Sequence, residues 1–321
     1  MNTPFDIPDN PDSACRPPSA KDFLVDRIFR ALARIGVALI LALVFALIFE
    51  VGRKALPGME KHGFDVLFGT VWDVNQGKYG ILPAIWGTLY SAFIALVIAG
   101  FFGVSMAIFL TQDFLPAKLA AVFRTIVELL AAIPSVVYGL WGIYVVIPAI
   151  RPLTAWLNSE LGWIPFFGTS LSGPGLLPAA LVLAIMILPT VAAVSQDALT
   201  SVPMKTKQAA YGLGTTHWEA ILKVMVPSAA TGIFGSLVLG LGRALGETMA
   251  LAMLEGNPNT ITVSLFAPAN TLAALLALNF PEAGPTEVEV LMYAALVLMF
   301  ITLLVNVLGS LLMLYAQRGN K

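Results

Sequence analysis

The chain has 321 residues, of which 58% are hydrophobic and only 12% are charged, and its formal net charge is -1. A soluble domain of this size would not stay in solution with so few charges, so the composition indicates an integral membrane protein. The near-zero net charge argues against a nucleic-acid-binding protein, which would present a basic face. The single cysteine, Cys15, excludes an intrachain disulfide and a cysteine-based metal cluster.

The N-terminal part of the chain changes from polar to apolar. Residues 1–20 are rich in Pro, Asp and Ser and have almost nothing to bury, so we expect a disordered cytoplasmic tail there. A basic, helix-prone stretch over residues 21–34 leads into an apolar run that ends at Phe49. Residues 21–80 are therefore predicted to contain the first transmembrane helix and a periplasmic loop.

Five further apolar runs follow, at residues 81–110, 119–150, 175–195, 228–254 and 290–315. Crossing a hydrocarbon core of ~30 Å takes ~20 helical residues, so each run is long enough to span. In the third run of the chain we expect a kink at Pro134, because a proline ring does not fit a regular helix interior. The sequence thus predicts an all-α membrane protein with six transmembrane helices, whose core is formed by residues 81–321.

The distribution of basic residues indicates how the chain crosses the membrane. Most of the 18 Lys and Arg residues fall in the two terminal segments and in the loops that would share their side of the membrane. Cytoplasmic loops carry an excess of Lys and Arg. We therefore expect both termini, and the polar loop over residues 196–227, to lie in the cytoplasm.

That polar loop carries a regular pattern just before the fifth apolar run. The pattern consists of Gln208, Ala209 and Ala210, then Gly214, and finally Val224, Val226 and Pro227. The alanines are strong helix formers with small side chains, Gly214 can take the positive φ that ends a short helix, and Pro227 suits a helix start. The pattern favours a helix-turn-helix on the membrane surface that a partner could contact, and the alternative is a solvated loop between two spans.

The spacing of this pattern resembles the EAA loop of ABC importer permeases, which reads E-A-A-x3-G-x9-I-x-L-P. Gln208 stands in the place of the Glu, and Val224 and Val226 stand in the places of Ile and Leu. Two further stretches, residues 128–141 and 240–250, resemble the PstC family of phosphate importer permeases. The resemblance implies a type I ABC importer permease-like fold, in which residues 196–227 are the cytoplasmic coupling loop of the permease core.

The same resemblance implies a function and a set of partners. The chain would be the permease subunit of an ATP-driven phosphate importer in the bacterial cytoplasmic (inner) membrane, and would form half of the translocation pathway. It would pair with a PstA-like permease, dock on two PstB-like ATPase subunits and receive phosphate from a PstS-like periplasmic binding protein. No cofactor is expected in this chain, because ATP and Mg would be bound by the partner ATPase.

Two ionisable residues lie deep inside the fifth apolar run. Arg243 and Glu247 are four residues apart, so on a continuous helix they would share a face. Such groups are costly in a membrane unless they are paired or face a cavity. We expect Arg243 to bind an oxyanion in transit through its planar fork, and Glu247 to orient it or to accept a hydrogen bond from a P–OH group. The alternative is a structural ion pair.

The connection between the last two spans, residues 255–289, carries acidic but no basic residues, and its middle is apolar. It is expected to contact a periplasmic partner or to be a simple connector at the membrane interface.

Motifs of other protein classes are absent from the sequence. There is no G-x4-G-K-[ST] loop for ATP, no H-E-x-x-H zinc motif and no G-x-S-x-G nucleophile, so neither an enzyme nor a metal site is expected. An ion-coupled secondary transporter remains the main alternative, although it would leave the coupling-loop pattern without a purpose. Permeases for sulfate or molybdate share that pattern, so the anion depends on the resemblance.

Overall fold

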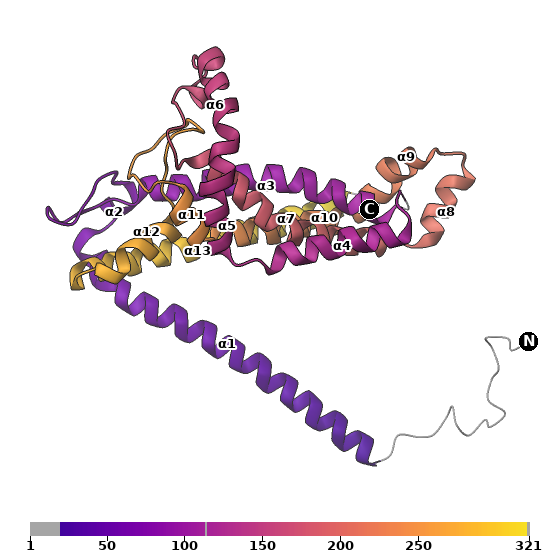
Figure 1. Cartoon of the computed structure of the whole chain (residues 1–321). Helices are drawn as coiled ribbons and strands as arrows, with labels where there is room; N and C mark the ends of the chain where they lie inside the picture. The colour runs from indigo at the N-terminus through magenta and orange to yellow at the C-terminus, as the bar shows by residue number, and fades with distance from the viewer. Residues whose placement is uncertain (1–19, 113, 320–321) are drawn as a thin grey trace, which may run out of the picture. The chain divides into compact units, whose positions relative to one another are not determined.

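The computed structural model of the protein describes residues 20–112 and 114–319. It is mostly helical, and its described part contains six helices that are long and apolar enough to cross a membrane (Figure 1). This confirms the predicted all-α class and the number of spans. The tail expected at residues 1–20 lies outside the described residues except for Ala20. The chain divides into two compact units, one ending at Arg53 and one beginning at Lys54.

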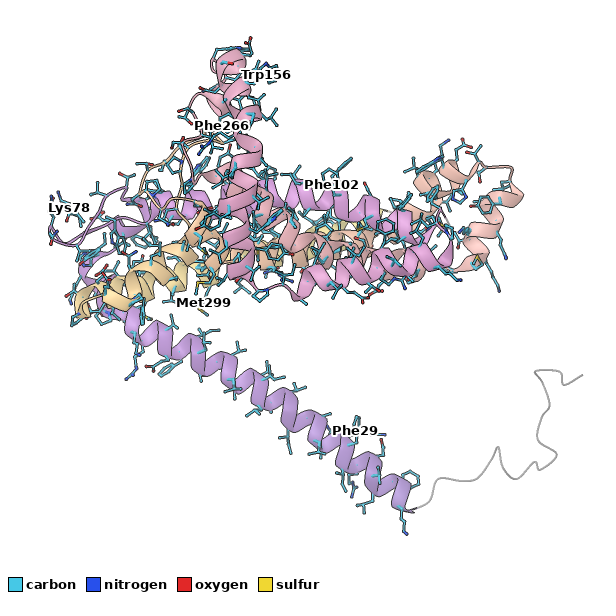
Figure 2. All side chains as sticks on the ribbon, in the orientation of Figure 1. Phe29, Lys78, Phe102, Trp156, Phe266 and Met299 are labelled. Carbon is cyan, nitrogen blue, oxygen red and sulfur yellow. The ribbon has the colours of Figure 1, made fainter. Side chains whose placement is uncertain are left out.

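The described part of the first unit is the beginning of helix α1 (Ala20–His62). Its apolar side chains, Phe29 among them, project on all sides and are exposed (Figure 2). A helix that is apolar all round suits a lipid environment. The helix does not end near Phe49 as expected but continues through Pro57, and its last turns belong to the second unit, where Lys61 forms an ion pair with Glu289 at 2.7 Å.

The second unit contains the remaining elements. They are, in chain order, α2 (Asp65–Phe68), β1 (Trp72–Asp73), β2 (Lys78–Tyr79), α3 (Leu82–Thr111), α4 (Ala117–Ala132), α5 (Ser135–Trp141), the π-turn η2 (Gly142–Val146), α6 (Ile147–Leu161), the 3-10 turn η3 (Pro165–Phe167), α7 (Leu176–Thr200), α8 (Met204–Gly212), α9 (His217–Ala220), the π-turn η4 (Ile221–Met225), α10 (Val226–Leu245), α11 (Met249–Leu254), α12 (Leu272–Asn279), the 3-10 turn η5 (Phe280–Glu282) and α13 (Pro285–Gly319). The two short strands pair antiparallel in a small hairpin that the sequence did not predict.

Helices α3, α7 and α10 form the centre of this unit, with α13 against α10 (Figure 1). Small residues at their contacts let the backbones approach closely, as membrane helices require. A Cβ at Gly103 of α3 or at Gly240 of α10 would lie within about 3 Å of Val191 on α7. A buried hydrogen bond of 2.8 Å between the hydroxyls of Ser195 and Ser236 also joins α7 to α10.

The third apolar run is not one kinked helix, so that prediction is wrong. Helix α4 ends at Ala132, and Ile133 and Pro134 are both extended, with ψ of 128° and 142°. A proline disfavours the helical conformation of the residue before it, which explains why the chain leaves the helix at Ile133. The candidate span is instead the continuous helix Ser135–Leu161, which combines α5, η2 and α6.

The fifth apolar run also differs from the prediction of one helix over residues 228–254. The helix begins earlier, because α9, η4 and α10 join into one candidate span over His217–Leu245. It ends earlier as well, since residues 246–248 are not helical and α11 starts at Met249. Glycine at position 246 favours such an interruption because it has a poor helix propensity.

The continuous helices Ser135–Leu161 and His217–Leu245 each contain one π-helical turn that ends two residues before a proline. In η2 the N–H of Ile147 bonds to the carbonyl of Gly142, and Pro148 follows. In η4 the N–H of Val226 bonds to the carbonyl of Ile221, and Pro227 follows. Inside a regular helix a proline ring clashes with the carbonyl four residues back, and one extra residue in the preceding turn relieves this crowding. The two helices therefore pass through their prolines without ending.

After α11 the chain forms a loop over residues 255–271, which we call the return loop. Its backbone bonds to the start of α7, since the N–H groups of Leu176 and Leu177 donate to the carbonyls of Ala267 and Leu265 at 3.0 and 2.8 Å. Phe266, labelled in Figure 2, is buried there. The return loop is thus partly packed into the core, although Ile261 and Val263 remain exposed.

Candidate functional site

Arg243 lies in the last turn of α10, where the helix carbonyls favour a cation. Its Nη1 donates a hydrogen bond to the hydroxyl of Thr190 on α7, at 3.2 Å. Its charge also acts on the hydroxyl of Tyr138 on α5, which donates to the carbonyl of Leu130 at 2.8 Å. Arg243 is exposed in this single chain, and its guanidinium has five N–H donors, so it retains donors for a ligand.

Glu247 lies in the interruption between α10 and α11. Its Oε1 accepts a hydrogen bond from the N–H of Ala250 at 3.3 Å, which supports the first turn of α11. The prediction that Arg243 and Glu247 share one helical face is wrong, because α10 ends at Leu245. Among the residues that the structure describes the two side chains form no ion pair, so the structural-pair alternative is not found either.

Helix α11 is held closely against the neighbouring helices. A Cβ at Gly139 would meet the sulfur of Met253 at 2.7 Å, and a Cβ at Gly142 would meet the methyl groups of Leu254 at the same distance. These glycines therefore allow α5 and η2 to approach α11. Glu247 thus precedes the short helix α11, whose position is fixed by packing, whereas Arg243 lies in the last turn of the long helix α10.

The predicted coupling pattern forms two short helices joined by a turn. Gln208 and Ala209 are exposed on α8, while Ala210 is buried and its carbonyl accepts the hydroxyl of Thr215 at 2.8 Å. Gly214 has φ +82°, as the pattern predicted. Val224 belongs to the π-helical turn η4, which runs directly into α10 at Val226 and Pro227. Pro227 therefore lies inside the continuous helix His217–Leu245 and does not mark its start.

The second of these helices starts with a capping box. The hydroxyl of Thr216 accepts the N–H of Glu219, and the Glu219 carboxylate accepts the N–H of Thr216 at 3.1 Å. The carboxylate also pairs with Lys223 one turn later, at 3.0 Å. These bonds satisfy donors that a helix start leaves free, so the helix that carries Arg243 in its last turn has a well-defined beginning.

The coupling segment, residues 203–220, is anchored to the connection between α3 and α4. His217 is the main anchor, since its Nε2 bonds to the carbonyl of Gln112 at 3.1 Å and its Nδ1 to the hydroxyl of Tyr211 at 3.2 Å. The ring of Phe114 lies 5.0 Å from the rings of both His217 and Trp218. Beyond this anchor Leu213 is 87% exposed, which leaves an apolar contact point at the tip of the segment.

Residues 99–321 match the model of a protein family described as the binding-protein-dependent transport system inner membrane component. The chain belongs to this family. The match begins within α3 and covers α4 to α13, and so both the Arg243 region and the coupling segment of the permease.

Curated relatives extend the match over nearly the whole permease. It is 38% identical to the phosphate transport system permease protein PstC of Xylella fastidiosa (strain Temecula1), over 93% of each chain. It is also 38% identical to the PstC of Haemophilus influenzae, over 92% of this chain and 95% of that one, and 35% identical to a probable PstC of Methanocaldococcus jannaschii. These relatives place the permease among the PstC proteins, which are transport subunits.

Solved structures show the same fold. The permease aligns with a chain of a bacterial alginate ABC transporter with a TM-score of 0.61 at 16% identity, covering 90% of this chain and 94% of that one. A chain of the MetNI methionine ABC transporter gives a TM-score of 0.55 at 20% identity, covering 74% and 95%. The multi-pass ABC importer permease fold expected from the sequence is therefore confirmed.

Sequence reasoning did not identify two residues of the site. Thr190 binds Arg243 from another helix, and nothing in the local pattern around Pro189 indicates that contact. His217 anchors the coupling segment, and its position directly after two threonines at the start of a helix was the only available signal. Both contacts join segments far apart in the sequence.

Proposed function

We propose that this permease is the membrane subunit of an ATP-driven phosphate importer and forms half of its translocation pathway. The observation that supports this best is the 38% identity, over 93% of the chain, to a relative named as a phosphate transport permease. The chain would bind no cofactor of its own, and ATP and Mg would be bound by a separate ATPase.

The proposed importer contains several chains in the bacterial cytoplasmic (inner) membrane. The permease would pair with a PstA-like permease, rest on two PstB-like ATPase subunits and accept phosphate from a PstS-like periplasmic binding protein. Both termini would be cytoplasmic, with residues 196–227 as the coupling loop. The family description, which names a binding-protein-dependent inner membrane component, supports this arrangement.

Arg243 is the proposed contact for the anion. A guanidinium presents paired N–H donors that match two phosphate oxygens, and Thr190 uses one donor and holds the side chain toward α7. Because Glu247 does not neutralise Arg243, the positive charge remains available to the anion. Glu247 would accept a hydrogen bond from the P–OH group that phosphate carries and sulfate lacks, with the start of α11 holding its carboxylate in place.

The coupling segment would transmit the motion of the ATPase to this site. The exposed residues Gln208, Ala209 and Leu213 provide the contact, and His217, the first residue of the helix that follows, bonds back to Tyr211 of α8. That helix is continuous from His217 to Leu245 and carries Arg243 in its last turn. A displacement of the segment would therefore move Arg243 directly, and the substrate site and the ATP site would lie on different chains.

The test is uptake of labelled phosphate, with sulfate and molybdate in parallel, in cells that lack this chain and in cells with it restored. We expect selective loss and rescue of phosphate uptake, and no rescue by Arg243→Lys, which keeps the charge but loses the fork. Arg151→Lys, at an arginine that bonds only to the carbonyl of Ser172 in the described residues, is the matched control. Rescue of another anion would contradict the substrate, and uptake driven by an ion gradient without ATP hydrolysis would contradict the importer.

A further inference from the structure

Glu255 is a buried titratable residue that has no part in the proposed transport mechanism. This residue follows α11 and begins the return loop, outside the six candidate spans. Its side chain is fully buried, with 0% exposure. Neither carboxyl oxygen has a hydrogen-bond partner of good geometry within the described part of the chain. An isolated carboxylate is among the most costly groups to bury, so its charge state needs an explanation.

Among the described residues Glu255 forms no ion pair. The preceding helix α11 contacts α5, η2, α7 and α12, and Ser91 lies on α3; of these elements α3, α5, η2 and α12 contain no charged residue. The charged residue of α7, Asp197, lies near the opposite end of that helix. The titratable groups on these elements are Tyr90, Tyr138 and Tyr144; the first two donate their protons to backbone carbonyls, and the third is exposed.

Two hydroxyl groups lie close enough to influence the carboxyl group, those of Ser91 on α3 and Thr271 at the start of α12, although neither forms a hydrogen bond of good geometry with it. The Ser91 hydroxyl already donates its proton to the carbonyl of Gly87, at 2.7 Å, so toward Glu255 it can only accept. The Thr271 oxygen accepts the N–H of Ala274 at 3.3 Å, so its proton remains to be donated. The site therefore offers Glu255 one donor and one acceptor.

A carboxylate can only accept hydrogen bonds, whereas a carboxylic acid can donate one and accept one. We propose that Glu255 is a neutral carboxylic acid in the working permease, which donates to Ser91, accepts from Thr271 and so positions the return loop against α3. Burial without a cation raises the pKa of Glu255 to about 8, despite the opposing effect of the two hydroxyls.

The position of Glu255 connects this proton to the proposed anion site. Its own carbonyl accepts the N–H of Ala269 at 2.9 Å, and the carbonyl of Leu254 accepts the N–H of Gly175 at 2.8 Å. Helix α11 lies between these bonds and the turn that carries Glu247. When Glu255 loses its proton, the buried charge displaces the return loop and with it the start of α11, so Glu255 acts as a positioning residue for transport.

The test compares Glu255→Gln with the natural chain across pH, and it depends on the proposed function only through the uptake arm. Glutamine reproduces the neutral acid, since its amide can donate to Ser91 and accept from Thr271 but cannot titrate. We expect the uptake of labelled phosphate by the natural chain, divided by that of Glu255→Gln, to fall about tenfold between pH 7 and about pH 9. The reason is that about a tenth of an acid remains protonated one pH unit above its pKa. Glu160→Gln, at an exposed glutamate, should follow the natural chain.

A second arm does not require transport. Hydrogen exchange of the amides of residues 255–271, expressed as protection factors in the purified full-length chain, should show loss of protection above pH 8 in the natural chain and constant protection in Glu255→Gln. If the protection of residues 255–271 depends on pH but the chain imports no phosphate, the proposed function is refuted and this inference still holds. Identical pH profiles for the two chains in the exchange measurement would overturn the inference, whatever the substrate.

Discussion

The coupling segment and the return loop lie toward opposite ends of the helical core (Figure 1), and their polar groups find partners in different ways. In the coupling segment the partners are close in sequence: Thr216 bonds to Glu219, and Glu219 to Lys223. The segment reaches the rest of the chain mainly through His217. Such an element keeps its shape when it moves.

In the return loop the partners are far apart in sequence. Trp86 and Tyr90 of α3 donate to the carbonyls of Thr262 and Val263, both at 2.9 Å. The side-chain amide of Asn259 donates to the carbonyls of Thr70 and Gly80 beside the short hairpin. Moving this loop would break several hydrogen bonds to distant segments at once, three of them exposed and one half-buried, and each broken bond costs up to roughly 1 kcal/mol.

This difference indicates a division of mechanical roles. The coupling segment and the helix from His217 to Leu245 form a lever, because one capped helix begins just after the tip and carries Arg243 in its last turn. Since α10 packs against α3, α7 and α13, a movement of the lever would shift those contacts as well. The return loop and α11 form a fixed frame, because they bond to α3, α7 and α12. The interruption at residues 246–248 separates the lever from the frame, and Glu247 lies inside it.

The largest effect is expected from a substitution in the frame. In Gly87→Ala the new methyl group would overlap the backbone carbonyl of Asn270, and a backbone group cannot rotate away. Overpacking of this kind costs about 1–3 kcal/mol, so thermal unfolding in detergent should occur at lower temperature and phosphate uptake should be nearly lost. Gly235→Ala is the control, since its nearest neighbour, the sulfur of Met313, is 3.7 Å away. Equal stability of the two variants would show that the return loop is not a rigid frame.

A substitution in the lever should separate hydrolysis from transport without unfolding the chain. Gly214 has φ +82°, a conformation that costs a β-branched residue roughly 1–2 kcal/mol, although the space around it is open. In Gly214→Val we expect the turn to rearrange, so that ATP hydrolysis by the assembled importer continues while phosphate uptake is lost. Gly212→Val, in equally open space but without a positive φ, should remain coupled. Coupled transport in Gly214→Val would refute the lever.

The same division explains what could be read from the sequence. The six spans, the positive φ of Gly214 and the helix-turn-helix around it follow from residues that are neighbours in the chain, and the structure has all of them. The break after Ala132 was foreseen only as a kink, although Pro134 was recognised. A proline disfavours helix at the residue before it, which agrees with the end at Ala132, but the helices that continue through Pro148, Pro189 and Pro227 show that this preference alone does not decide where a helix ends.

The contacts that define the site could not be read in this way. Arg243 meets Thr190 across 53 residues, and Glu255 faces Ser91, which lies more than 160 residues earlier. The i, i+4 spacing of Arg243 and Glu247 suggested a pair, but it holds only if the helix continues, and residues 246–248 interrupt it. Periodicity describes one element at a time, whereas these contacts depend on how elements pack.

A smaller effect is expected at the joint between lever and frame. Glu247→Gln keeps the oxygen that accepts the N–H of Ala250, so α11 should remain in place. It removes the negative charge that would favour the P–OH group, so the preference for phosphate over sulfate should fall by up to about tenfold, or about 1.4 kcal/mol. Competition between labelled phosphate and unlabelled sulfate measures this. Unchanged preference with normal uptake would leave Glu247 with only its role at the start of α11.

The smallest effect is expected from the cap of the lever. Thr216→Val keeps the shape of the side chain but removes the hydroxyl that accepts the N–H of Glu219, and losing such a cap costs about 1 kcal/mol. His217 still anchors the segment, so uptake should fall by no more than a few fold, while amides of the first turn of α9 should exchange faster. Thr125→Val, which removes only a mid-helix bond to the carbonyl of Ala121, is the control. Complete loss of uptake in Thr216→Val would mean that coupling requires the cap itself, and the lever would then begin at Thr216 and not at the anchor His217.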